Sequence, residues 1–163
     1  MVYGFKMITS GTLLTLLLVS LASVTRASVK TETLPFWECS SDVPVPTSVT
    51  LECESLVNGI CLLRKGQTHQ LKAEFTPGVS TSTKLQSYVA WKRWVEMPIP
   101  GQDSGACDNF VKCPLTHGTR SIFKYPLEIQ NFWMRRRYPM VWRLTDDATH
   151  RDVFCFIIRI QII

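Results

Sequence analysis

The chain has 163 residues, of which 18 are Lys or Arg and 13 are Asp or Glu, so its formal net charge is +5. This length suits one domain, and so mild a positive charge argues against a nucleic-acid-binding protein.

The N-terminus has the pattern of a secretory signal peptide covering residues 1–27. Lys6 precedes an apolar run from Leu13 to Ala22, and small residues suitable for cleavage lie between positions 22 and 27. A membrane anchor is the alternative, but the run is shorter than the roughly 20 residues that a spanning helix needs. Residues 28–163 then form an exported domain. Its charge is 16 − 13 = +3, because the signal segment contains Lys6 and Arg26 and no acids.

Six cysteines follow in the exported part, and an even number in an exported chain predicts three disulfides. They are Cys39, Cys53, Cys61, Cys107, Cys113 and Cys155. A zinc site is the alternative, but the close Cys and His pairs that it needs are missing. Spacing favours two short rings, one from Cys53 to Cys61 and one from Cys107 to Cys113, although sequence alone leaves other pairings open.

Apolar and polar residues alternate along most of the domain, as in half-buried strands. The alternation covers residues 49–54, 69–76, 85–97, 140–145 and 154–162, and in the second of these His69, Leu71, Ala73 and Phe75 share one face. Turn-forming sequences such as Asn58-Gly59 separate the segments, and no amphipathic helix longer than a turn or two is evident. About seven strands at this spacing predict an all-β, antiparallel β-sandwich of two sheets.

Prolines predict where strands lie at sheet edges, because proline has no backbone N–H for a central ladder. The residues from Trp91 to Met97 read as one strand that ends, or runs along an edge, at Pro98 and Pro100. Arg93 would fall on the apolar face of that strand, so we expect a bulge or a rim position there. Pro126 should also lie at an edge.

Catalytic motifs are missing from the sequence, which predicts no enzyme, no cofactor and no metal site. Asp146, Asp147, His150 and Asp152 could form an acid–base or metal cluster. They lie in a predicted hairpin turn, however, where acidic residues are common, and we favour that interpretation.

One segment combines apolar and basic residues, with Phe132, Trp133 and Met134 preceding Arg135, Arg136 and Arg137. Two interpretations stay open. The aromatics could fold back onto the core above a solvated loop. Alternatively, Phe132 and Trp133 could dip into a membrane interface while the three arginines meet anionic headgroups.

Several motifs together resemble the ML-domain lipid-recognition family, most closely its soluble sterol carriers of insect type. They are Val49-Thr50-Leu51-Glu52-Cys53, Cys61 to Gln67, the corner from Met97-Pro98-Ile99-Pro100 to Cys107, Cys113-Pro114-Leu115, Tyr138-Pro139, and Trp142 to Asp146. The resemblance extends from Trp37 to the C-terminus. It implies an immunoglobulin-like sandwich with a lipid cavity between the sheets, and its disulfide pattern agrees with the two short rings plus Cys39–Cys155.

The resemblance also implies lipid-contacting positions. Met97 stands where the family has an aromatic residue before Pro-Ile-Pro, Leu127 follows the Tyr125-Pro126 step, and Tyr138 precedes a proline at the mouth. Among the bulky apolar residues we add Trp91, Phe75 and Trp142 as expected cavity contacts.

The expected function is that of a secreted or endolysosomal carrier that holds a sterol and transfers it. An innate-immune or chemosensory protein binding bacterial lipid or fatty acid is the alternative, and the missing nucleophile argues against a hydrolase. Expected partners are a sterol or other apolar lipid and an anionic membrane surface or a membrane sterol transporter, with the chain a monomer.

Overall fold

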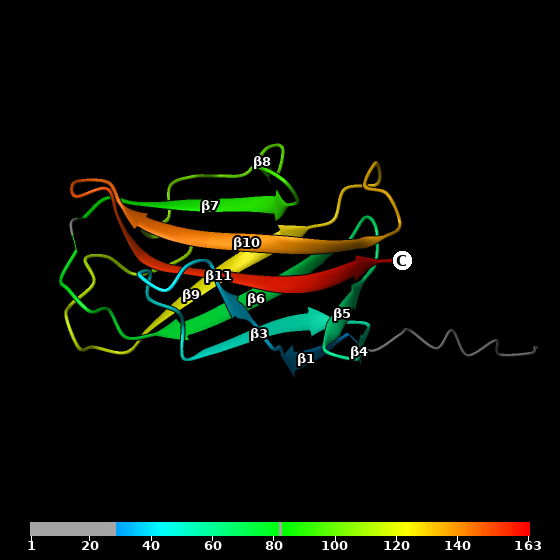
Figure 1. The fold of residues 1–163 in the computed structure, drawn as a ribbon, viewed down its shortest axis with the longest axis horizontal. Coiled ribbons are helices and arrows are strands. Elements are labelled where there is room, and N and C mark those ends of the chain that lie inside the picture. Colours follow the sequence, from blue (N-terminus) through cyan, green and yellow to red (C-terminus); the bar gives the residue numbers. More distant parts are fainter. Residues whose placement is uncertain (1–28, 82) are drawn as a thin grey trace, which may run out of the picture.

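A computed structural model describes residues 29–81 and 83–163 as eleven β-strands in two sheets (Figure 1). The expected signal peptide lies outside the described residues. The strands are β1 (Lys30–Thr33), β2 (Trp37–Glu38), β3 (Ser48–Cys53), β4 (Ser55–Val57), β5 (Ile60–Leu63), β6 (Thr68–Phe75), β7 (Leu85–Lys92), β8 (Glu96–Pro98), β9 (Ser121–Glu128), β10 (Arg137–Asp146) and β11 (Arg151–Ile162).

The smaller sheet has the order β1-β3-β6-β9, and all its pairs are antiparallel. Strands β3, β6 and β9 alternate between buried and more exposed positions, as the sequences of β3 and β6 predicted. The inward face of β6 consists of His69, Leu71, Ala73 and Phe75. Period-two alternation therefore assigns this sheet's inner face correctly.

The larger sheet has the order β4-β5-β11-β10-β7-β8, and β2 pairs with β11 beside this path. Its pairs are antiparallel except β5 with β11, which run parallel. The two longest strands, β10 and β11, form its centre, with a register shift between Leu144 and Thr145. The C-terminal strand β11 therefore lies between β10, which directly precedes it in sequence, and β5 from the first half of the chain.

The core lies between the two sheets, so the predicted all-β sandwich is confirmed. Aromatic rings from both sheets meet there. Phe154 of β11 packs edge-on against Phe75 of β6 at 4.9 Å and against Phe123 of β9 at 5.4 Å, measured between ring centroids. Within the described ranges, no helix has the length and apolar character needed to cross a membrane.

Three disulfides join the predicted pairs, Cys39–Cys155, Cys53–Cys61 and Cys107–Cys113. The first spans 116 residues and links β2 to the central strand β11. The other two close rings spanning 8 and 6 residues. The spacing argument is therefore confirmed.

One predicted strand is wrong. The chain reverses at Arg93–Val95, and β8 pairs back onto β7 with Trp91 opposite Met97. Residues 91 and 97 share a face both in a straight strand and in this hairpin, so alternation cannot distinguish the two. The reversal places Arg93 in an exposed turn rather than a bulge.

The two proline predictions are confirmed. Pro98 lies in β8 and Pro126 lies in β9, and each of these strands forms the edge of its sheet. The chain between these two edges covers this side of the sandwich, because Ala106 N–H donates to the carbonyl oxygen of Leu85 in β7 and Lys124 N–H of β9 donates to that of Phe110.

The β4–β5 turn requires a glycine at position 59. Asn58 and Gly59 both have positive φ, 50° and 73°, as a two-residue hairpin turn of type I′ requires. A Cβ on Gly59 would also lie 2.9 Å from Cγ of Pro35. We expect Gly59→Ala to lower the free energy of unfolding by about 1–3 kcal/mol. Gly78→Ala is the matched control, because a Cβ there meets nothing within 4 Å; similar losses in urea denaturation for both variants would contradict the prediction.

Candidate functional site

Three aromatic side chains gather where β7 ends and β10 begins, at the right of Figure 1, and we call this the aromatic end. Trp91 lies 5.0 Å from Trp133 and 5.8 Å from Tyr138, and the rings of Trp133 and Tyr138 are 6.0 Å apart. Trp133 and Tyr138 are buried, and Trp91 is half-buried. The three rings therefore close this end of the sandwich.

The loop between β9 and β10 holds the aromatic end in place. The Trp133 backbone N–H donates to the carbonyl oxygen of Gln130 at 3.1 Å. The Tyr138 hydroxyl donates to the carbonyl oxygen of Met134 at 3.0 Å. The Arg136 guanidinium lies 4.9 Å from the centre of the Tyr138 ring, a cation–π contact. Entry at this end therefore requires the loop to move.

A groove of about 470 Å³ lies between the segment that follows β8 and the edge strand β9. This volume falls in the usual range for small-molecule sites. Its apolar floor includes Phe110 and Tyr125, whose rings lie 4.8 Å apart, and it ends against Trp133. The other lining residues are Ile99, Pro100, Gly101, Gln102, Asp103, Asn109, Pro126, Glu128 and Gln130. The groove thus leads from solvent to the aromatic end.

Four of the six expected lipid contacts lie at this end. Leu127 is fully buried on β9, Tyr138 is buried on β10, and Met97 lies opposite Trp91 with 38% of its surface exposed. With Trp91, these positions come from four different strands, β7 to β10, and from both sheets. The structure therefore brings together most of the residues that sequence reasoning selected.

Phe75 and Trp142 lie elsewhere. Phe75 ends β6 at the opposite end of the sandwich, against Phe154, about 20 Å along the strand from His69 at a rise of about 3.3 Å per residue. Trp142 is midway along β10 and stacks on Phe156 at 5.8 Å. Alternation predicts which face a residue occupies and says nothing of its position along the strand. Phe75 is therefore a residue of the distant core.

The expected cavity is filled by side chains in this structure. Leu127 and Trp142 have no exposed surface, and Phe75 has 2%. No open space therefore touches them. A ligand between the sheets would have to separate groups that are now in contact.

The predicted membrane-contact residues divide into two groups. Phe132 is 65% exposed, and Arg135 and Arg137 are exposed beside it. Trp133 is buried in the aromatic end, so its expected surface position is wrong. Arg136 is half-buried on the Tyr138 ring. One aromatic side chain of the loop thus folds inward and the other points out, and membrane contact stays a prediction.

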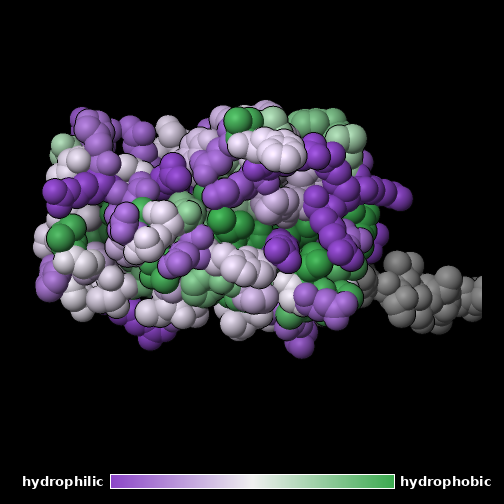
Figure 2. All heavy atoms as spheres, viewed as in Figure 1, coloured by the Kyte–Doolittle hydropathy of each residue, from purple (hydrophilic) through white to green (hydrophobic). Residues whose placement is uncertain are grey.

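The structure places Trp94 at the tip of the β7–β8 hairpin with 98% of its surface exposed. Val95 beside it is 67% exposed, and Met134 of the β9–β10 loop is 59% exposed. Figure 2 shows hydrophobic and strongly hydrophilic surface side by side at the upper right, the region of that loop in Figure 1. Exposed apolar and basic side chains therefore surround the aromatic end.

A second hollow, of about 800 Å³, lies at the opposite end around the β10–β11 turn. Its acidic groups are engaged in local structure. Asp146 Oδ1 accepts from the backbone N–H groups of Ala148 and Thr149, and Asp152 accepts from the Thr145 hydroxyl at 2.9 Å. Among residues 29–81 and 83–163, no group of three His, Cys, Asp or Glu is placed to hold a metal ion. The hydrogen bonds of Asp146 are those of a turn, the interpretation favoured above.

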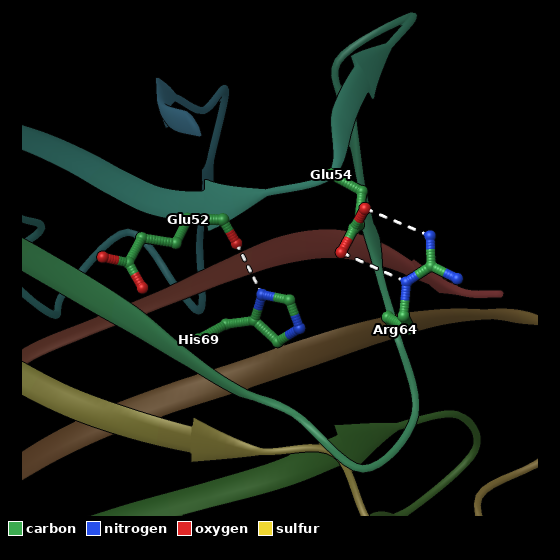
Figure 3. A network of polar contacts seen from close by, with 4 residues as sticks. All are labelled: Glu52, Glu54, Arg64 and His69. Atoms are coloured by element: carbon green, nitrogen blue, oxygen red, sulfur yellow. Dashed lines mark hydrogen bonds and ion pairs between the residues drawn. The ribbon is translucent and has the colours of Figure 1, made fainter. Parts of the chain in front are cut away.

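His69 is a buried polar residue that sequence reasoning placed on the inner face of β6 without assigning it a role. It has no exposed surface, and its Nδ1 lies 3.0 Å from the carbonyl oxygen of Glu52 (Figure 3). Its Nε2 has no hydrogen-bond partner among the described residues. In the register of the smaller sheet His69 lies opposite Leu127, so it belongs to the aromatic end.

Tyr125 in the groove should titrate late. Burial, and secondarily the Asp103 carboxylate, raise the pKa of Tyr125 to about 12. In the unfolded chain this phenol ionises near its usual pKa of about 10, so its contribution to stability is complete below pH 10 and is lost as pH rises toward 12. Spectrophotometric titration of the native protein should show a step near pH 12 that Tyr125→Phe removes. A native spectrum with all phenols ionised by pH 11 would contradict this.

The chain is similar to several known proteins. A family model described as ML domain matches residues 33–162. NPC intracellular cholesterol transporter 2 of Danio rerio is 26% identical over 108 residues, covering 63% of this chain and 68% of that protein. Putative protein heh-1 of Caenorhabditis elegans is 28% identical over 131 residues, covering 76% and 83%. The crystal structure of a Niemann-Pick type C2 protein from Japanese carpenter ant matches with a TM-score of 0.68 and 17% identity, covering 80% of this chain and all of that one. The last similarity shows a shared fold.

Proposed function

Because the chain belongs to the ML domain family, we propose that it is a lipid carrier that takes up one apolar molecule between its two sheets at the aromatic end. Family membership identifies it as a binding protein rather than an enzyme.

The observation that carries the proposal is the groove beside β9. It lies between the segment that follows β8 and β9, it is lined by the rings of Phe110 and Tyr125, and it reaches Trp133 of the aromatic end. An apolar ligand that continued past Trp133 would meet Leu127 and Tyr138 and no charged group of either inner face. Burying it would gain about 25 cal/mol per Å² of apolar area, which could offset the parting of the rings.

A sterol is the leading cargo. The zebrafish relative is named as a cholesterol transporter, and the residues shared with sterol carriers, Leu127 and Tyr138, lie together at the aromatic end. Met97 stands where those carriers have an aromatic residue at the rim. Because a methionine side chain is flexible, the outer part of the pocket should accept a wider range of ligand shapes than in those carriers. Three disulfides support action in an oxidising compartment, either outside the cell or in the endolysosomal lumen.

Transfer requires contact with a membrane. Trp94, Phe132 and Met134 are exposed near the groove, and Arg135 and Arg137 lie beside them. Anionic headgroups would attract the arginines while the apolar side chains enter the interface. The carrier would then present the aromatic end to the bilayer.

The test is a lipid extract of the secreted protein, read by mass spectrometry, together with displacement of a fluorescent sterol. We expect one sterol per chain. A bacterial lipid or a fatty acid would favour the alternative immune or chemosensory role, and a protein that binds no lipid of these kinds would overturn the proposal.

A pair of substitutions should locate the cargo. Leu127→Phe adds bulk where the sheets must separate, so sterol binding should fall at least tenfold. Leu144→Phe adds the same bulk at the opposite end, beside Ser87, and should leave binding unchanged. Each should cost about 1–3 kcal/mol of stability through overpacking. Equal loss of sterol binding in both variants would show that the binding change reports only general destabilisation.

A further inference from the structure

The tautomer of the neutral His69 ring follows from its one hydrogen bond. A backbone carbonyl oxygen can only accept, so Nδ1 must carry the hydrogen that it donates to Glu52 at 3.0 Å. In the neutral imidazole the lone pair then lies on Nε2. Figure 3 shows the Glu52 carboxylate turned away from the ring, and that carboxylate accepts instead from the backbone N–H of Gln70 at 2.9 Å. His69 thus presents an acceptor to the interior.

An unpaired acceptor at this buried position lowers the stability of the fold. A buried polar group without a partner forfeits the hydrogen bond that it makes in water, and such groups are uncommon in folded proteins. The inner faces around His69 are apolar, with Leu127 opposite it in the sheet and Leu71 two residues along the strand. The indole N–H groups of Trp91 and Trp133 are also buried without partners at this end. Unpaired polar atoms therefore concentrate where the proposed cargo would enter.

We propose that His69 Nε2 accepts a hydrogen bond from a hydroxyl group of the cargo, which makes this carrier selective for neutral lipid alcohols. The inference rests on the lipid-carrier function proposed above. An alcohol has the O–H that Nε2 needs, whereas an ether, an ester or an ionised carboxylate has none. His69 lies on β6, one strand inward from β9, so the hydroxyl is bound inside the sandwich rather than at its rim.

Binding of a sterol and of its 3-O-methyl ether tests this directly, because the two differ only in the donor. We expect the wild-type protein to bind the alcohol about tenfold more tightly, the cost of leaving one buried acceptor unpaired. His69→Phe should remove the preference by weakening the alcohol alone. His69→Gln, whose amide oxygen can accept, should keep part of it. Ser87→Ala is the matched control, since it removes another buried unpartnered polar atom, far from the aromatic end, and should leave the preference intact.

A second measurement needs no variant. The ¹⁵N resonance of His69 Nε2 should shift when the alcohol binds and should stay in place when the ether binds. Equal affinities with an unmoved resonance would overturn the role of His69 while leaving the carrier function intact. A wild-type protein that binds neither compound would instead overturn the carrier function itself. If His69→Phe does not fold, the resonance of the wild-type protein decides.

Discussion

Replacing Cys39 and Cys155 together by alanine should lower the free energy of unfolding by about 4–5 kcal/mol, the largest loss expected from any disulfide here. The bond closes a loop of 116 residues, and in the chain-entropy model the stabilisation grows with loop length. The Cys39–Cys155 bond also lies next to the short ladder in which Glu38 is opposite Phe156. Loss of the bond would therefore weaken the pairing of β2 with β11.

The Cys107–Cys113 pair is the control. Its ring spans 6 residues, for which the same model gives about 2 kcal/mol. Guanidinium denaturation of the two double-alanine variants, read by tryptophan fluorescence, measures both losses. If the two losses were equal, loop length would not determine the contribution of these bonds.

The double substitution Trp94→Ser with Phe132→Ser should weaken binding to anionic vesicles by roughly 100-fold and leave the unfolding free energy unchanged. Trp94 is 98% exposed and Phe132 is 65% exposed, so neither ring contributes much to the core. If each buries about 100 Å² in the interface, the two together supply about 5 kcal/mol before the cost of ordering the loops. Vesicle sedimentation and thermal melting report the two properties separately.

Val79→Ser controls for exposed apolar surface as such, because Val79 is 58% exposed and borders the hollow at the opposite end. It should leave vesicle binding unchanged. Arg135→Gln with Arg137→Gln should cost about 1 kcal/mol per charge at low salt and less at high salt. Undiminished vesicle binding by the Trp94 and Phe132 double variant would exclude the aromatic end as the membrane-facing surface.

Much of the fold could be predicted, because alternation depends only on which face of a strand is buried. His69, Leu71, Ala73 and Phe75 point inward as their spacing indicated. The edge positions of Pro98 and Pro126 followed from the missing N–H group, and the disulfides followed from spacing that agreed with the family pattern.

The errors concern what alternation leaves undetermined. It gave the same face for Trp91 and Met97 in a straight strand and in a hairpin, so the exposed tip at Trp94 was missed. It placed Phe75 on the correct face at the wrong end. Local pattern also could not show that Trp133 turns inward while Phe132 turns outward, because that choice depends on Trp91, more than 40 residues earlier in the sequence.

The position of β11 in the larger sheet has a consequence for how the chain folds as it is made. β2 and β5 are synthesised early, yet both pair with β11, the last strand in chain order. Until the ribosome has completed residue 162, these strands have exposed edges, and Cys39 has no native partner and lies nearest in sequence to Cys53. A newly made chain should therefore depend on disulfide exchange and on protection of its strand edges until the final strand arrives.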